Sequence, residues 1–113
     1  MFTAVILMKR KDGTTREEFL DYYRDRHGPL MVTLMKDKGL VSYEHFPLNL
    51  DAYPGLHLSP EAKEWDAVSI YTYESQQKCE ECWSIPEVIV DSQNFMNQTT
   101  MITIPVDRRM VFP

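Results

Sequence analysis

The histidine at position 27 is the residue of this sequence best suited to acid–base chemistry near neutral pH. In the segment EEFLDYYRDRHGPLM, residues 17–31, it closes a helical pattern and is followed by Gly28 and Pro29. The helix dipole at this end favours the imidazolium, whereas burial against a sheet favours the neutral ring. These opposing effects predict an imidazole that acts as a general acid or base. The alternative is a histidine that caps the helix by hydrogen bonding to a free backbone carbonyl.

Three further polar residues lie in segments predicted to be neighbouring strands. Tyr43 and His45 are two residues apart and therefore share one face, and Asp66 opens the next strand. If all three face the helices, they surround His27, with the carboxylate orienting a histidine and the tyrosine hydroxyl stabilising an enolate or phenolate oxygen. We therefore predict His27, His45, Asp66 and Tyr43 as catalytic residues. The alternative places Tyr43 and His45 in a subunit interface or in solvent, and strand parity does not decide between the two faces.

A second group of side chains is suited to binding an aromatic substrate. His57 belongs to a long loop, residues 47–64, that can cover a pocket. The aromatic members can stack on a substrate ring, although aromatic side chains more often pack in a core. The predicted substrate-binding residues are Tyr23, His57, Trp65, Tyr71 and Trp83.

No pattern in the sequence indicates a metal or a cofactor. Cys79 and Cys82 form a lone C-x-x-C whose two intervening glutamates oppose the lowered thiol pKa of a redox pair. A structural zinc site needs four ligands, and neither a second cysteine pair nor a nearby histidine is present. We expect chemistry that needs no cofactor.

Composition and charge limit the class of protein. The chain has 113 residues, of which 43% are hydrophobic and 26% charged, and a net charge of −5. These values suit a globular domain and argue against a nucleic-acid partner. The first apolar run, MFTAVILM, is too short for a membrane span and precedes its basic residues instead of following them. We expect a soluble, cytoplasmic protein without a membrane partner, whose single domain occupies residues 1–113.

The hydrophobic pattern predicts alternating strands and helices. Thr15 and Glu18 have the spacing of a capping box, Ser75 is suited to cap a helix, and Pro86 is suited to the first position of another. The predicted strands are 2–9, 40–46, 65–74 and 99–106, and the predicted helices are 15–38, interrupted at Gly28 and Pro29, 75–82 and 84–96. This order is the ferredoxin-like βαββαβ pattern, an α+β fold with a four-stranded antiparallel sheet and helices on one face.

Apolar side chains occupy both faces of the first predicted strand. Ile6 and Met8 lie on one side and Val5 and Leu7 on the other. Because a sheet with one solvated face alternates more strictly, we expect the second face to be buried in a homodimer.

The segment LMKRKDGTTREEFLDYYRDRHGPLM, residues 7–31, resembles the opening of EthD-domain proteins. The later elements, from Trp65 and Asp66 through Asp91 and Phe95, are similar but looser. The resemblance implies a dimeric α+β barrel and activity on aromatic or polyketide intermediates. It favours a cofactor-free lyase or cyclase, such as a dehydratase or decarboxylase, in which His27 acts as general acid or base. Two alternatives stay open: an oxygen-using enzyme of the same barrel type, such as a cofactor-independent monooxygenase or a haem-degrading relative, and a non-catalytic dimeric module that binds a hydrophobic ligand.

Overall fold

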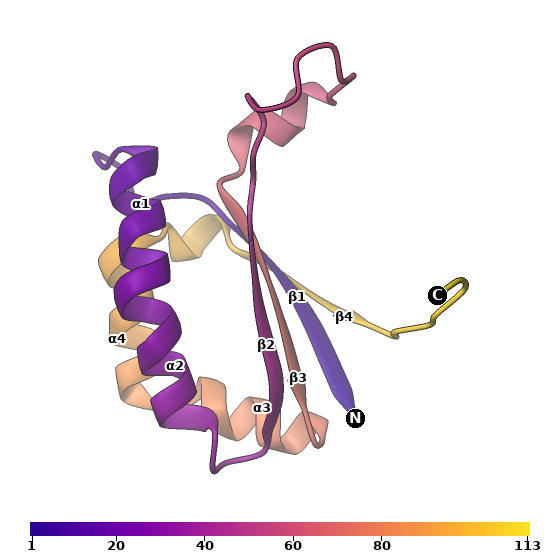
Figure 1. The fold of residues 1–113 in the computed structure, drawn as a ribbon. Helices are drawn as coiled ribbons and strands as arrows, with labels where there is room; N and C mark the ends of the chain where they lie inside the picture. Colours follow the sequence, from indigo (N-terminus) through magenta and orange to yellow (C-terminus); the bar gives the residue numbers. More distant parts are fainter.

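A four-stranded antiparallel sheet carries all of the longer helices on one of its faces (Figure 1). The computed structural model describes residues 1–113. The strands are β1 (Phe2–Met8), β2 (Leu40–Pro47), β3 (Ala67–Tyr73) and β4 (Ile102–Val106), in the sheet order β2-β3-β1-β4. The helices are α1 (Arg16–Tyr22), η1 (Tyr23–His27), α2 (Gly28–Met35), η2 (Pro60–Glu64), α3 (Gln76–Trp83), α4 (Pro86–Phe95) and η3 (Gln98–Thr100). The ferredoxin-like α+β fold is therefore confirmed.

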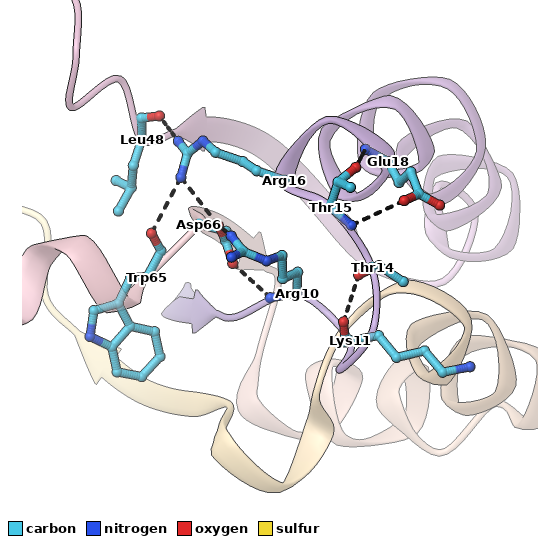
Figure 2. Close-up of polar contacts among 9 residues, drawn as sticks. All are labelled: Arg10, Lys11, Thr14, Thr15, Arg16, Glu18, Leu48, Trp65 and Asp66. Atoms are coloured by element: carbon cyan, nitrogen blue, oxygen red, sulfur yellow. Dashed lines mark hydrogen bonds and ion pairs between the residues drawn. The ribbon is translucent and has the colours of Figure 1, made fainter.

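The predicted helix starts agree with the caps that the structure forms. The Thr15 hydroxyl accepts from the backbone N–H of Glu18, whose carboxylate accepts in return from the backbone N–H of Thr15 (Figure 2). Ser75 caps α3 through the backbone N–H of Lys78, and Pro86 opens α4. Three boundaries were predicted wrongly. Residues 98–100 form a short 3-10 helix, so β4 begins at Ile102, β3 begins at Ala67 instead of residue 65, and α2 ends at Met35 instead of residue 38.

The α-helical pattern is interrupted just before Gly28 and Pro29, as the sequence predicted, but the chain stays helical across the interruption. A five-residue π-helical segment, η1, joins α1 to α2, and Gly28 keeps helical dihedral angles of −55° and −54°. Because the N–H of Gly28 reaches back to the carbonyl of Tyr23, five residues earlier, the wider turn continues the helix into Pro29, which lacks an N–H. His27 is the last residue of this wide turn, and π-bulges of this kind are frequent at functional sites.

The register of the sheet decides which side chains meet the helices. Tyr43 lies opposite Tyr71, and His45 lies opposite Ser69. Tyr71 in turn lies opposite Ala4 of β1, so one face runs continuously across the three strands. Tyr71, Ser69 and Ala4 are buried, which identifies this face as the one that the helices cover.

The other face of the sheet is mainly apolar and has no helix against it (Figure 1). It carries Val5, Leu7, Phe46, Val68, Ile70, Ile102 and Ile104. Phe46, Ile102 and Ile104 are 45%, 41% and 42% exposed. None of the protein's helices combines the length and the apolar character that a membrane-spanning segment needs.

Candidate active site

His27 is buried and paired with a carboxylate from a distant part of the chain. Its Nδ1 lies 2.8 Å from Oδ2 of Asp91 on α4. The other oxygen of Asp91 accepts a hydrogen bond of 2.6 Å from the hydroxyl of Tyr22, which itself accepts from the side-chain amide of Asn94 at 3.2 Å. A carboxylate only accepts hydrogen bonds, so Nδ1 of His27 carries a hydrogen and the lone pair of the ring lies on Nε2. His27 is therefore not a backbone cap.

The free nitrogen of His27 opens on a cavity between the sheet and helices α2, α3 and α4. Nε2 makes no hydrogen bond within the protein. Because no fully buried side-chain nitrogen or oxygen lacks a partner, Nε2 is not fully buried and is accessible. The cavity that His27 lines has a volume of about 100 Å³. Its wall is mainly apolar and includes Ile6, Met31, Trp83, Val88, Met96 and Met101. A proton acceptor held by a carboxylate thus faces a mostly apolar space, the arrangement expected of a general base.

Burial and the carboxylate act on the imidazole in opposite directions. Burial lowers the pKa of His27, and the hydrogen bond and negative charge of Asp91 partly counteract this effect. The ring is consequently neutral at pH 7. Burial raises the pKa of the Tyr22 phenol, and its bond to Asp91 adds to the rise. Tyr22 therefore remains a hydrogen-bond donor that fixes the carboxylate.

Tyr43 and His45 face the helices, one of the two placements that the sequence left open. The Tyr43 hydroxyl lies 2.5 Å from Nε2 of His45. The His45 ring stacks on Tyr23 with centroids 3.6 Å apart, and the Tyr23 hydroxyl bonds to Ser69 at 2.5 Å. Burial, reinforced by the positive charge that His27 carries when it is protonated, lowers the pKa of His45 to about 4. These residues support the site from beside the cavity and do not line it.

Gly28 allows His45 to approach the helix closely. A Cβ at position 28 would lie 2.9 Å from Cε1 of His45 and 3.3 Å from the backbone oxygen of Tyr23. Both distances are shorter than ordinary carbon contacts. Gly28 therefore serves the packing of helix on sheet, since its dihedral angles are helical.

Asp66 does not lie beside His27, contrary to the predicted constellation. It precedes β3 and accepts from the backbone N–H of Arg10 at 2.7 Å, from the Arg10 guanidinium at 3.0 Å and from Arg16 at 3.2 Å (Figure 2). Arg16 also donates to the backbone oxygens of Leu48 and Trp65. Asp66 therefore holds together the end of β1, the start of α1 and the entrance to β3.

The other predicted binding residues divide into two groups. Tyr71 and Trp83 line the cavity, and Nε1 of Trp83 donates to the Tyr73 hydroxyl at 2.8 Å. Trp65 packs under the ammonium group of Lys9, 4.7 Å from the ring centroid, and does not line the cavity. His57 is exposed on the loop between β2 and η2. The structure thus places only two of these five residues, together with His27, at the cavity.

Asp91 is the functional candidate that the sequence analysis missed. It shares the buried side of α4 with Val88, Ser92 and Phe95. A carboxylate on the apolar stripe of a helix is rare unless it is paired. Its position in the pattern Val88, Asp91, Ser92, Phe95 was therefore a readable signal, but the sequence did not indicate which partner it would meet.

Residues 11–99 match the sequence model of the EthD domain. The chain belongs to the EthD-domain family. No curated protein matches this EthD-domain protein significantly.

Solved structures similar to this EthD-domain protein share its fold at low sequence identity. A hydroxynitrile lyase from Passiflora edulis has a TM-score of 0.66 and 11% identity, with 99% of this chain and 96% of that one covered. A cofactor-independent oxygenase from Streptomyces nogalater has a TM-score of 0.60 and 12% identity, with 99% and 96% covered. A dimeric ferredoxin-like protein from an uncultured marine organism has a TM-score of 0.61 and 11% identity, with 100% and 99% covered. The fold thus occurs in a lyase, an oxygenase and a dimer.

Proposed function

We propose that this EthD-domain protein, acting as one domain over residues 1–113, is a cofactor-independent lyase or cyclase that uses His27 as its general base and acid. The substrate class is an aromatic, polyketide-type small molecule, and the reaction is a dehydration, a decarboxylation or a ring closure. The observation that carries the proposal is the buried His27–Asp91 pair, 2.8 Å apart, whose free Nε2 opens on an apolar cavity.

Each member of the pair has a defined part in the proposed chemistry. Neutral His27 accepts a proton from an acidic C–H or O–H of the substrate through Nε2 and becomes an imidazolium. Asp91 stabilises that imidazolium through Nδ1 and keeps the ring in the productive tautomer. The same proton then returns to the leaving oxygen or to carbon, so no external acid is needed. Tyr71 lines the cavity and supplies a hydroxyl for a developing oxyanion, whereas the Ser92 hydroxyl donates to the backbone carbonyl of Val88 at 2.8 Å.

Hydrogen–deuterium exchange tests the proton-transfer step without the natural substrate. In D2O, the protein should accelerate exchange of the α-protons of acetophenone, followed by proton NMR. His27→Ala should reduce the rate to that of the buffer. Val90→Ala is the matched control, since Val90 lies on α4, is 58% exposed and does not line the cavity. Equal exchange by the wild-type protein and His27→Ala would exclude His27 as the base.

A cofactor-independent oxygenase is the second candidate, and the similar fold of the Streptomyces nogalater oxygenase supports it. An apolar cavity beside a base suits an enolate or phenolate that reacts directly with oxygen. Haem-dependent chemistry is disfavoured, because a cavity of about 100 Å³ is far smaller than the macrocycle. An oxygen electrode separates the candidates: consumption that follows addition of a phenolic substrate supports the oxygenase.

The proposed assembly is a homodimer formed through the outer face of the sheet. The apolar side chains there are exposed in the single chain, and the fold is similar to that of a dimeric ferredoxin-like protein. Burying Phe46, Ile102 and Ile104 against a second sheet would remove them from water. The active-site cavity lies on the helix side of each sheet and stays outside this interface.

A further inference from the structure

The cavity beside His27 carries no charged side chain that would neutralise an anionic ligand. Of its lining residues, only His27 titrates near neutral pH, and the others are apolar, hydroxyl or amide side chains. The nearest fixed charge is negative, the carboxylate of Asp91 that pairs with His27. A carboxylate placed here would lose its water and meet no cation.

No lysine or arginine lines the cavity. Arg10 and Arg16 bond to Asp66, and the cavity wall includes neither of them. Arg24 pairs with Asp21 and Asp25 on the exposed side of the first helix. Arg26, next to His27 in the chain, acts on the Tyr22 phenol and does not line the cavity either, so the cavity wall supplies no guanidinium or ammonium group.

The volume of the cavity limits the size of the ligand, as its lack of cationic side chains limits the charge. The cavity of about 100 Å³ is of the same order as the roughly 150 Å³ of apolar space that holds one benzene molecule in an engineered protein, so it has room for about one ring. The cavity is open on one side, where exposed Ile89 of α4 lines it, so substituents can project outward. Met31, Met96 and Met101 are flexible enough to follow the shape of one ring but do not provide room for several fused rings.

We infer that the part of the substrate that enters the site is uncharged and no larger than a single six-membered ring, with one hydroxyl or carbonyl group facing Nε2 of His27. This inference rests on the proposed function and narrows it. Decarboxylation of a β-keto acid would place a carboxylate in the cavity, whereas dehydration and enolisation need only neutral groups. The site is thus suited to proton transfer on a neutral phenol, alcohol or ketone.

Calorimetric titration of the wild-type protein at pH 7 with phenol and with benzoate tests the inference, because the probes are similar in size and differ in charge. Phenol should bind and shift the imidazole nitrogen resonances of His27 in NMR spectra. Benzoate should bind more weakly by on the order of ten-fold or more, and 1-hydroxyanthraquinone should not displace phenol. Benzoate binding as tight as that of phenol would overturn the charge argument, and displacement by the anthraquinone would overturn the size argument.

Two neighbouring substitutions on α4 locate the bound probe. Ile89→Trp places a large side chain at the mouth of the cavity and should weaken phenol binding at least about ten-fold, whereas Val90→Trp should leave it unchanged. Both positions are exposed, at 43% and 58%, so both variants should fold. Equal phenol binding by both variants, without a response from His27, would place phenol elsewhere and refute the assignment.

The phenol-binding experiments test the ligand class, and the acetophenone-exchange experiment tests the catalytic role of His27, so either claim can fail without the other. If phenol binds selectively but His27→Ala still exchanges acetophenone protons, the ligand class stands and the catalytic role fails. If exchange requires His27 but benzoate binds as well as phenol, the catalytic role stands and the ligand class fails.

Discussion

Replacing Asp91 by asparagine should reverse the tautomer of His27. The asparagine side chain has nearly the same shape but presents one oxygen and one NH2 group in place of two acceptors. Asn94 donates to the Tyr22 hydroxyl, which directs the Tyr22 hydrogen towards residue 91. The amide oxygen then faces Tyr22 and the NH2 group faces Nδ1 of His27, which must become the acceptor. The ring hydrogen moves to Nε2, where it blocks the proposed base.

The magnitudes follow from the bonds that Asp91 makes. Both of its hydrogen bonds, at 2.8 and 2.6 Å, lose the charge of the acceptor, at a cost of about 1 kcal/mol each. We expect the free energy of unfolding to fall by about 2 kcal/mol. The pKa of His27 should fall further, because burial lowers it and Asp91 no longer counteracts that effect. The rate of proton exchange from acetophenone should drop by up to about 10⁴-fold, the loss seen when the aspartate that orients the catalytic histidine of a serine protease becomes asparagine.

Long-range nitrogen–proton NMR spectra of the imidazole identify the tautomer of His27, and urea unfolding measures the free energy of unfolding. Asp66→Asn is the control, because it removes a buried carboxylate of the same fold that contacts Arg10 and Arg16 and not His27. It should destabilise the protein and leave the His27 spectrum unchanged. Adding Tyr22→Phe to Asp91→Asn should restore the original tautomer, since the amide oxygen is then free to accept from Nδ1. An unchanged tautomer and pKa of His27 in Asp91→Asn would refute the reasoning.

Three further predictions concern the supporting structure. His45 has a pKa near 6.5 in the unfolded chain and about 4 in the folded protein, so the free energy of unfolding should fall as the pH drops between these values. In urea titrations, His45→Gln should reduce that fall. Gly28→Ala should lower the free energy of unfolding by about 1–3 kcal/mol, because the added Cβ pushes against His45. In a double-mutant cycle, His45→Ala should relieve this loss, and no relief would contradict the contact. Ile104→Asp should convert the proposed dimer to a monomer in light-scattering chromatography, whereas Val32→Asp on the helix side, with a similar exposure of 43% against 42%, should not.

Local signals in the sequence determined most of the elements. The Thr15 capping box, Ser75 and Pro86 start their helices where predicted, because each cap depends on residues within one turn. The equal apolarity of the two faces of β1 indicated a sheet covered by helices on one side and apolar on the other. His27 was recognised as a candidate base from its place in the RDRHGPLM segment.

The partners of His27 required the tertiary structure. Asp91 lies on the apolar stripe of its helix and Asp66 does not, but neither residue, 64 and 39 positions after His27, shows locally which partner it meets. The packing of α4 across the wide turn of η1 brings Asp91 to Nδ1, while the junction of β1, α1 and β3 draws Asp66 to two arginines. The sequence rule for the residue before a proline did not predict the π-helical turn, because it disfavours helical geometry at Gly28, which is helical in the structure. Single residues of the sequence thus indicated the type of chemistry. The pairing of His27 with Asp91 that makes this chemistry possible depends on contacts between segments far apart in the chain.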